Sequence, residues 1–300
     1  MNQDILTLPV QFFSGGQPIV GDLFLPAGPA PAGGFPAVIC AHGYGGIRKT
    51  TTPDTARAYA RAGFAAMIFD FRGFGDSGGQ RWLLLPRNEV EDTRNAITWL
   101  AADARIDASR IAIHGSSFGG AVAVATAAVD DRLRCVICSV GIGNGRRWLQ
   151  SLRRNHEWLE FCAEVDQDRV ERVRTGQSRM VDPYYIMISD PFSVQRHVEL
   201  NRDFPERIFQ LPLESAEAIM DFVPEDEMAR ATPRPGLILA VAGDSLVSEN
   251  ESRQIYAKWP GPKQLVVLNG FRHHDVYASA LVPTMAATLP FLREHLQLAG

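Results

Sequence analysis

The run R-I-A-I-H-G-S-S-F-G-G at residues 110–120 decides the fold, because it contains a serine with glycine two positions before and after it. The apolar residues that precede it predict a strand, and the alanine-rich stretch that ends near Val129 predicts a helix. A serine on a sharp strand-to-helix turn protrudes from the sheet, and the turn is too tight for Cβ atoms at either glycine position. Ser117 has this spacing on both sides and Ser116 does not. We therefore identify Ser117 as a candidate nucleophile.

Short apolar runs alternate with helical stretches on both sides of this serine. The runs are 37–41, 65–69, 110–114, 135–138, 237–242 and 265–268, and the helices between them include 52–62 and 88–102. This alternation is typical of βαβ units, so we predict an α/β fold with a mostly parallel sheet covered by helices on both faces. The first 25 residues alternate in polarity around a Ser-Gly-Gly-Gln turn and predict an antiparallel hairpin.

The alternation stops between residues 141 and 235, where charged and aromatic residues replace the buried strand runs. We predict a core formed by residues 1–141 and 236–300, with residues 142–235 inserted as a helical cap over the active-site edge of the sheet. Two interpretations of the aromatic residues Trp148, Trp158 and Phe161 stay open. They can line an acyl pocket, or they can pack the cap onto the core or into a homodimer interface.

Composition narrows the class of protein. Of the 300 residues 46% are apolar and 21% are charged, which is enough apolar side chain for a large core. The 30 basic and 34 acidic residues are scattered, so we expect no nucleic-acid partner. No apolar run is long enough to span a membrane, and four cysteines are too few for a disulfide scaffold. The first residues lack the features of an export signal, so we expect a cytoplasmic protein.

A serine nucleophile needs a histidine as base and a carboxylate that orients the histidine. In α/β folds with this serine pattern the order along the chain is serine, acid, histidine. Asp244 is the first carboxylate after the strand 237–242, and Glu249 and Glu251 follow where a helix is expected. The loop after the strand 265–268 carries His273 and His274, and the residues alone leave open which of the two is the base.

Several motifs together resemble those of α/β-hydrolase-fold serine hydrolases. They are A-H-G-Y-G-G at 41–46, F-D-F-R-G-F-G-D-S at 69–77, G-S-S-F-G-G at 115–120, D-S-L-V at 244–247 and H-H-D-V-Y at 273–277. More narrowly, the chain is similar to the branch with prolyl-oligopeptidase-like and X-Pro dipeptidyl-peptidase-like esterases, dienelactone-hydrolase-like proteins and fungal polyketide transferases. The resemblance covers the predicted core well and residues 142–235 weakly.

The resemblance implies roles for individual residues. In this branch the first residue of an H-x-D-x-Y pattern is the base, which selects His273 over His274. The acid follows a glycine in a G-x-x-D-x-x-V segment, and here Gly243 directly precedes Asp244. The oxyanion hole uses two backbone N–H groups, those of Phe118 and Tyr44. The hydroxyl of Tyr44 is a further candidate donor that the sequence does not decide.

The expected reaction is acyl transfer to water through an acyl-enzyme on Ser117, with a small-molecule carboxylic ester as substrate and no cofactor. Amides, thioesters, C–C bonds and acyl acceptors other than water stay open, because the fold is shared by all these activities. A non-catalytic binding module with the same fold is the alternative from another class. The G-x-G-x-x-G match at 73–78 has no helix behind it, and Cys135 and Cys138 would face opposite sides of a strand, so we expect neither nucleotide nor metal there.

Overall fold

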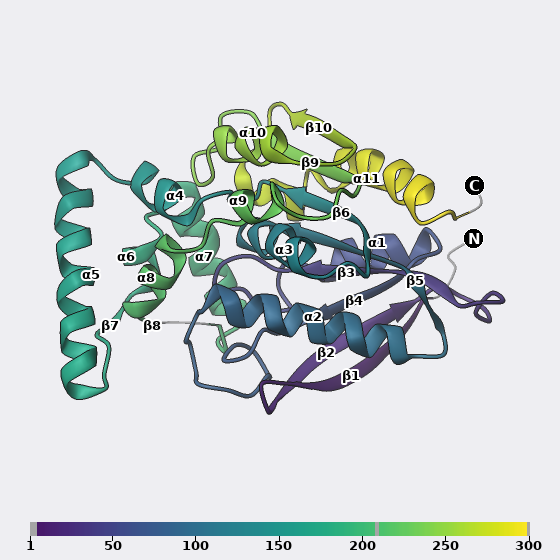
Figure 1. The fold of residues 1–300 in the computed structure, drawn as a ribbon, viewed down its shortest axis with the longest axis horizontal. Helices are drawn as coiled ribbons and strands as arrows, with labels where there is room; N and C mark the ends of the chain where they lie inside the picture. Colours follow the sequence, from purple (N-terminus) through teal and green to yellow (C-terminus); the bar gives the residue numbers. More distant parts are fainter. Residues whose placement is uncertain (1–4, 208–209, 299–300) are drawn as a thin grey trace.

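The central feature of the computed structural model, which describes residues 5–207 and 210–298, is an eight-stranded sheet (Figure 1). Its strands are β1 (Leu6–Ser14), β2 (Gln17–Leu25), β3 (Phe35–Ala41), β4 (Ala65–Phe69), β5 (Ile106–Ser116), β6 (Leu133–Ser139), β9 (Gly236–Val241) and β10 (Lys263–Leu268). The spatial order is β1-β2-β4-β3-β5-β6-β9-β10. The six strands β4, β3, β5, β6, β9 and β10 pair in parallel. The strands β1 and β2 form the predicted antiparallel hairpin at one edge, and β2 pairs antiparallel with β4.

Helices cover both faces of the sheet, which confirms the predicted α/β fold. The helices of the core are α1 (Pro53–Arg61), α2 (Pro86–Ala102), α3 (Phe118–Val129), α10 (Glu249–Lys258) and α11 (Leu281–His295). Alternate residues of the central strands enter two separate apolar layers, one with α2, α3 and α10 and the other with α1 and α11. Cys138 belongs to the first layer and Cys135 to the second, so these thiols lie on opposite faces.

Residues between β6 and β9 leave the sheet and form mainly helices. They are α4 (Gly145–Ser151), α5 (Asn155–Thr175), α6 (Pro183–Ile186), α7 (Pro191–Asp203), α8 (Glu214–Met220) and α9 (Pro224–Met228), with the short strands β7 (Met180–Val181) and β8 (Leu211–Pro212). We call residues 142–235 the inserted segment. Its long helix α5 stands at the side of the molecule opposite to the two chain ends (Figure 1).

The aromatic residues singled out in the inserted segment pack inside it and against the core. The Trp148 side chain is fully buried, its ring centroid lies 6.1 Å from that of Phe118, and its indole N–H donates to the carbonyl of Leu246 at 2.8 Å. Trp158 packs against Phe161 with ring centroids 6.0 Å apart. Of the two interpretations left open, this packing agrees with the structural one.

A buried group of charges ties the inserted segment to the core. The Glu251 carboxylate of α10 accepts hydrogen bonds from the backbone N–H groups of Gly143 and Asn144, at 2.9 and 3.1 Å, and from the Arg147 guanidinium. Arg147 also donates to Glu225 of α9 at 2.6 and 2.9 Å. Both carboxylates are almost completely buried, and Glu225 also accepts a hydrogen bond from the Lys258 ammonium at 2.7 Å, so each is compensated by donors from neighbouring elements.

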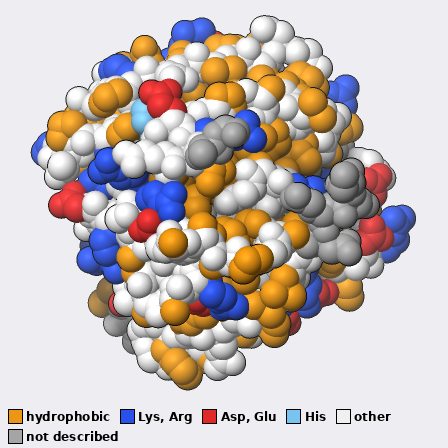
Figure 2. Space-filling view, turned by 90° about the vertical axis from the view of Figure 1, so that its right-hand side faces the viewer, with side chains coloured by type: hydrophobic (Ala, Val, Ile, Leu, Met, Phe, Trp, Pro, Cys, Tyr) orange, Lys and Arg blue, Asp and Glu red, His pale blue; other side chains and the backbone are white. Residues whose placement is uncertain are grey.

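The surface shown in Figure 2 is the face with the two chain ends, and on it acidic and basic side chains are interspersed among hydrophobic and uncharged ones. Within residues 5–207 and 210–298, no helix combines the length and apolar character that crossing a membrane requires.

We predict that Glu251→Gln lowers the free energy of unfolding by about 1–3 kcal/mol, because a buried charge-assisted acceptor of three groups is lost. Glu249→Gln on the same helix is the matched control. Its partner Arg253 is about half exposed, so its loss is expected to cost less than about 1 kcal/mol. Urea unfolding of both variants measures the difference, and equal losses would contradict the role assigned to Glu251.

Candidate active site

Ser117 occupies the turn between β5 and α3 in a backbone conformation that L-residues rarely adopt. Its φ is 58° and its ψ is −126°, and its N–H donates to the carbonyl of Ser139 on β6 at 2.9 Å. Such a conformation stores strain and persists only where the surroundings hold it. The turn therefore fixes the position of the Ser117 hydroxyl above the end of the sheet.

The glycines around Ser117 are required by close backbone packing. A Cβ atom on Gly115 would lie 1.9 Å from the carbonyl oxygen of Gly119. A Cβ atom on Gly119 would lie 2.4 Å from the carbonyl oxygens of Ala41 and His42. Both distances are far below van der Waals contact, so neither position accepts a side chain without backbone movement.

His114, three residues before Ser117, is held inside the sheet by two hydroxyl groups. One ring nitrogen lies 2.8 Å from the Tyr59 hydroxyl and the other 2.7 Å from the Ser139 hydroxyl. Burial lowers the pKa of His114 to about 4. We infer that His114 is a neutral structural residue that supports the end of β5.

The structure brings Ser117, His273 and Asp244 together from three loops at the carboxyl ends of β5, β10 and β9. The His273 Nε2 atom lies 2.9 Å from the Ser117 hydroxyl, and its Nδ1 atom lies 2.7 Å from the Asp244 carboxylate. The second Asp244 oxygen accepts the N–H groups of Leu246 and Val247 at 2.9 and 3.0 Å. The Asp244 carboxylate is thus buried but fully hydrogen-bonded, and it orients the His273 ring.

His274 lines the same pocket as Ser117 but has no hydrogen bond to Ser117 or Asp244. Its ring packs edge-on against His273 and His197, with centroid distances of 5.4 and 5.2 Å. Burial and the neighbouring His273 lower the pKa of His274 to about 2. Of the two adjacent histidines, His273 is the one that bridges Ser117 and Asp244.

The residues predicted for the oxyanion hole lie beside the nucleophile. The loop 42–46 passes so close that a Cβ atom on Gly43 would lie 3.0 Å from the Ser117 Cβ. Within the described part of the chain, the N–H groups of Tyr44 and Phe118 donate to no other group. The Tyr44 hydroxyl donates to the carbonyl of Pro183 in the inserted segment at 3.0 Å, so this hydroxyl is already occupied.

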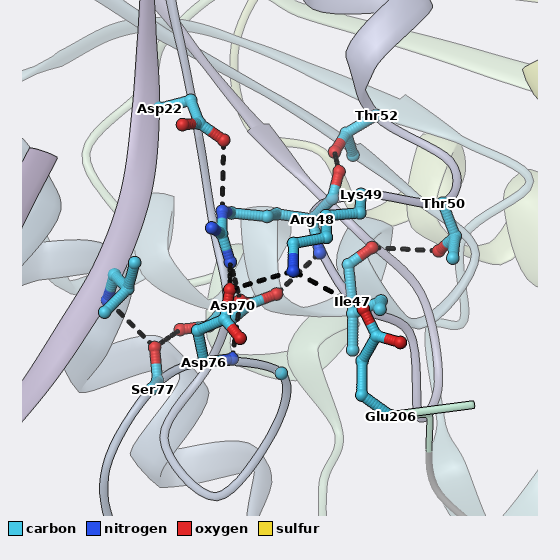
Figure 3. A network of polar contacts seen from close by, with 12 residues as sticks. Asp22, Ile47, Arg48, Lys49, Thr50, Thr52, Asp70, Asp76, Ser77 and Glu206 are labelled. Carbon is cyan, nitrogen blue, oxygen red and sulfur yellow. Dashed lines mark hydrogen bonds and ion pairs between the residues drawn. The ribbon is translucent and has the colours of Figure 1, made fainter. Parts of the chain in front are cut away.

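Arg48 holds this loop in place through a network that the sequence analysis missed (Figure 3). Its N–H donates to the Asp70 carboxylate at 2.6 Å, and its guanidinium contacts Asp70, Asp22 and Asp76. Asp70 is completely buried and also accepts the N–H of Asp76 at 3.0 Å. The loop that follows β3 is therefore bonded to β2 and to the loop that follows β4.

Tyr277 is a second residue of the site that the sequence analysis did not assign. Its hydroxyl lies 3.3 Å from the position of a Cβ atom on Gly43, next to the Ser117 hydroxyl. Burial raises the pKa of Tyr277, and a hydrogen bond with Ser117 acts in the opposite direction. The only signal in the sequence is its place in the H-x-D-x-Y pattern, which gives no role for it.

A narrow pocket of about 40 Å³ opens beside Ser117. The core contributes Gly43, Tyr44, Ser117, His273 and Tyr277 among its lining residues. The inserted segment contributes Met187, His197, Leu200 and Arg207. Trp148, Trp158 and Phe161 are not among the residues that line this pocket, which favours the interpretation that they pack the inserted segment rather than line an acyl pocket.

The parallel sheet, the strained serine turn and the hydrogen-bonded histidine and aspartate define the class of protein, which is an α/β hydrolase. Residues 15–274 match the family model of the X-Pro dipeptidyl-peptidase (S15 family). The chain belongs to this family, as the motifs of the sequence implied.

Relatives and solved structures agree with this assignment. The chain is 35% identical over 264 residues to a thiohydrolase of Eupenicillium brefeldianum, which covers 82% of this chain and 81% of the relative. It is 23% identical over 279 residues to the polyketide transferase grgF of Penicillium sp., with 87% of this chain and 88% of the relative covered. The crystal structure of the α/β hydrolase GrgF from Penicillium sp. sh18 superposes with a TM-score of 0.82 at 20% identity, over 98% of this chain and all of that one.

We predict that in His114→Gln the free energy of unfolding decreases less steeply than in the wild type as the pH falls below about 6.5. Because the folded pKa of His114 is about 4 and the ordinary value is about 6.5, the unfolded chain binds the proton first as the pH falls. Native stability is thus lost as the pH falls from about 6.5 to 4, at up to about 1.4 kcal/mol per pH unit from this histidine. Urea unfolding between pH 7 and 4.5 measures the slope, with the exposed His156→Gln as control. Equal slopes in wild type and His114→Gln would disprove this.

Proposed function

We propose that the protein is a serine hydrolase that cleaves carboxylic esters of small molecules through an acyl-enzyme on Ser117. The observation that carries the proposal is the continuous hydrogen-bond chain from Ser117 through His273 to Asp244, with distances of 2.9 and 2.7 Å. A serine hydroxyl is a weak nucleophile until an oriented base accepts its proton, and this chain supplies both the base and the orienting group.

In the first half of the reaction the Ser117 oxygen attacks the ester carbonyl while its proton moves to Nε2 of His273. The Asp244 carboxylate accepts the Nδ1–H hydrogen bond and stabilises the imidazolium that forms. The oxygen of the tetrahedral intermediate accepts hydrogen bonds from the N–H groups of Tyr44 and Phe118. His273 then protonates the departing alkoxide, and the acyl group stays on Ser117.

In the second half His273 removes a proton from water, and the water oxygen attacks the acyl carbonyl. The same two N–H groups stabilise the second oxyanion, and the Ser117 oxygen leaves with the proton from His273. No cofactor takes part in either half. The groups already present at the site therefore account for every proton that the reaction moves.

Thioesters are a second candidate substrate class. The thiohydrolase relative, which is 35% identical to this chain, favours this candidate. A thiolate leaves more readily than an alkoxide, so the same residues would suffice. A polyketide transferase among the relatives likewise raises acyl transfer to an alcohol or amine in place of water.

We further propose that the inserted segment is a cap that closes over the acyl site and sets its selectivity. The contribution of Met187, His197, Leu200 and Arg207 to the pocket beside Ser117 supports this role. Enclosure keeps bulk water from the oxyanion and strengthens the hydrogen bonds to it.

Substitution of each adjacent histidine tests the assignment of roles. Ser117→Ala and His273→Ala are each expected to lower kcat for p-nitrophenyl esters by roughly 10⁴-fold or more, because nucleophile and base act as a unit. His274→Ala should lower kcat by less than about tenfold, since its ring packs beside His273 without bonding Ser117.

The measurement is steady-state kinetics with circular dichroism as the check on folding. The opposite ranking of the two histidines would move the base to His274. Near wild-type turnover by folded Ser117→Ala would overturn the serine-hydrolase proposal. Absence of turnover and of serine labelling in the wild type would instead favour the binding-module alternative.

A further inference from the structure

A buried arginine lies in the wall of the pocket that holds the nucleophile. Arg207 follows α7 in a tight turn, where its N–H donates to the carbonyl of Phe204 at 3.1 Å. The residue is 5% exposed, and its side chain lines the same pocket as Ser117 and His273.

The Arg207 guanidinium has no countercharge among the described residues. Its Nε and Nη1 atoms are enclosed and have no hydrogen-bond partner in the described part of the chain. The other buried arginines differ, since Arg48 is paired with Asp70 and Arg234 donates to Asp131 at 2.7 Å and to three backbone carbonyls. An enclosed cation without a partner is costly, which indicates a missing anion rather than a packing role.

Three more polar side chains of the same pocket lack hydrogen-bond partners in the described residues. They are His197, at both ring nitrogens, His274, at Nε2, and Thr51, at its hydroxyl. Burial, with the charge of Arg207 as the next cause, lowers the pKa of His197 to about 3, so this ring is neutral and offers one N–H donor. Together these groups present a cation, an N–H and an O–H to the pocket.

Two carboxylates of the inserted segment, Asp190 and Asp182, already have donors of their own. Asp190 accepts hydrogen bonds from the Ser193 and Ser245 hydroxyls at 2.7 and 2.8 Å and from two backbone N–H groups at the start of α7. Asp182 accepts the N–H of Tyr184 at 2.7 Å. Arg196, on α7, adds a second positive charge that acts on His197. The field at the pocket wall therefore favours an anion.

The turn that carries Arg207 is attached to the core beside the oxyanion loop. Glu206 contacts the Lys49 ammonium at 3.4 Å, and Lys49 also pairs with Asp76 at 3.0 Å (Figure 3). Lys49 directly follows Arg48 in the loop that also supplies Tyr44. The position of Arg207 is thus coupled to the part of the core that contacts the nucleophile.

We propose that Arg207, assisted by His197 and Thr51, binds a carboxylate on the acyl part of the substrate. A planar guanidinium presents two parallel N–H donors that match a carboxylate, and enclosure strengthens the pair. The substrate class is then a monoester or monothioester of a dicarboxylic acid, with the free carboxylate on Arg207 and the other carbonyl at Ser117. This inference rests on the proposed hydrolase function and specifies that the acyl part of its substrate carries a negative charge.

The test compares two p-nitrophenyl esters with six-carbon acyl chains, the monoester of adipate and the hexanoate. The wild type is expected to show the higher kcat/KM with the charged adipate ester. Arg207→Met should lower kcat/KM for the adipate ester by about tenfold or more and leave that for the hexanoate within about threefold. Arg196→Gln is the matched control, because it removes a neighbouring but partly exposed charge, and it should change the ratio less than threefold.

Binding without turnover separates this proposal from the proposed function. Monomethyl adipate should raise the melting temperature of folded Ser117→Ala, whereas dimethyl adipate should not, and adding Arg207→Met should abolish the shift.

If the wild type cleaves both esters through Ser117 without a charge preference and the shift is absent, the carboxylate site is refuted and the hydrolase proposal stands. If the shift depends on Arg207 but Ser117→Ala keeps its turnover, the hydrolase proposal fails and the anion site remains. Equal loss of both esters in Arg207→Met would show a structural role and overturn the proposal.

Discussion

The contact between the first turn of α3 and the end of β3 is the constraint on which the site depends. The Gly119 backbone approaches the carbonyl oxygens of Ala41 and His42 so closely that a Cβ atom would lie 2.4 Å from them. This contact sets the distance between the serine turn and the loop that begins at His42. Since Phe118 belongs to the turn and Tyr44 to the loop, the same contact determines the spacing of the two N–H groups around the Ser117 hydroxyl.

Two buried charge networks connect the loops of the site to the surrounding elements. Arg48 and the completely buried Asp70 bond the loop after β3 to the loop after β4 (Figure 3). Because the loop after β3 carries Tyr44, this pair also restrains the position of the Tyr44 N–H. Glu251 and Arg147 bind the start of the inserted segment to α10, the helix that follows the Asp244 loop. These networks thus fix the pocket wall of the inserted segment relative to the hydrogen-bonded side chains of the core.

The parts of the site that the sequence predicts are those fixed by short motifs. Glycine spacing and the flanking strand and helix locate Ser117, and position after a late strand locates Asp244 and the histidine pair. Arg48 and Arg207 were not predicted, because the burial and pairing of a charge depend on residues that are distant in sequence. Aromatic content suggested pocket residues in the inserted segment, yet the fully buried Trp148 packs against Phe118. The pocket wall from this segment is instead formed by α7, by Met187 after α6 and by the turn that carries Arg207.

Covalent labelling tests the central claim, the activation of Ser117 by His273, most directly. The full chain is treated with a fluorophosphonate, and peptide mapping by mass spectrometry locates the adduct. We predict one adduct on Ser117, formed rapidly by the wild type and by His274→Ala, and at least a hundredfold more slowly by folded His273→Ala. An adduct on Ser116 or on another residue, or labelling at Ser117 that is indifferent to His273, would contradict the account.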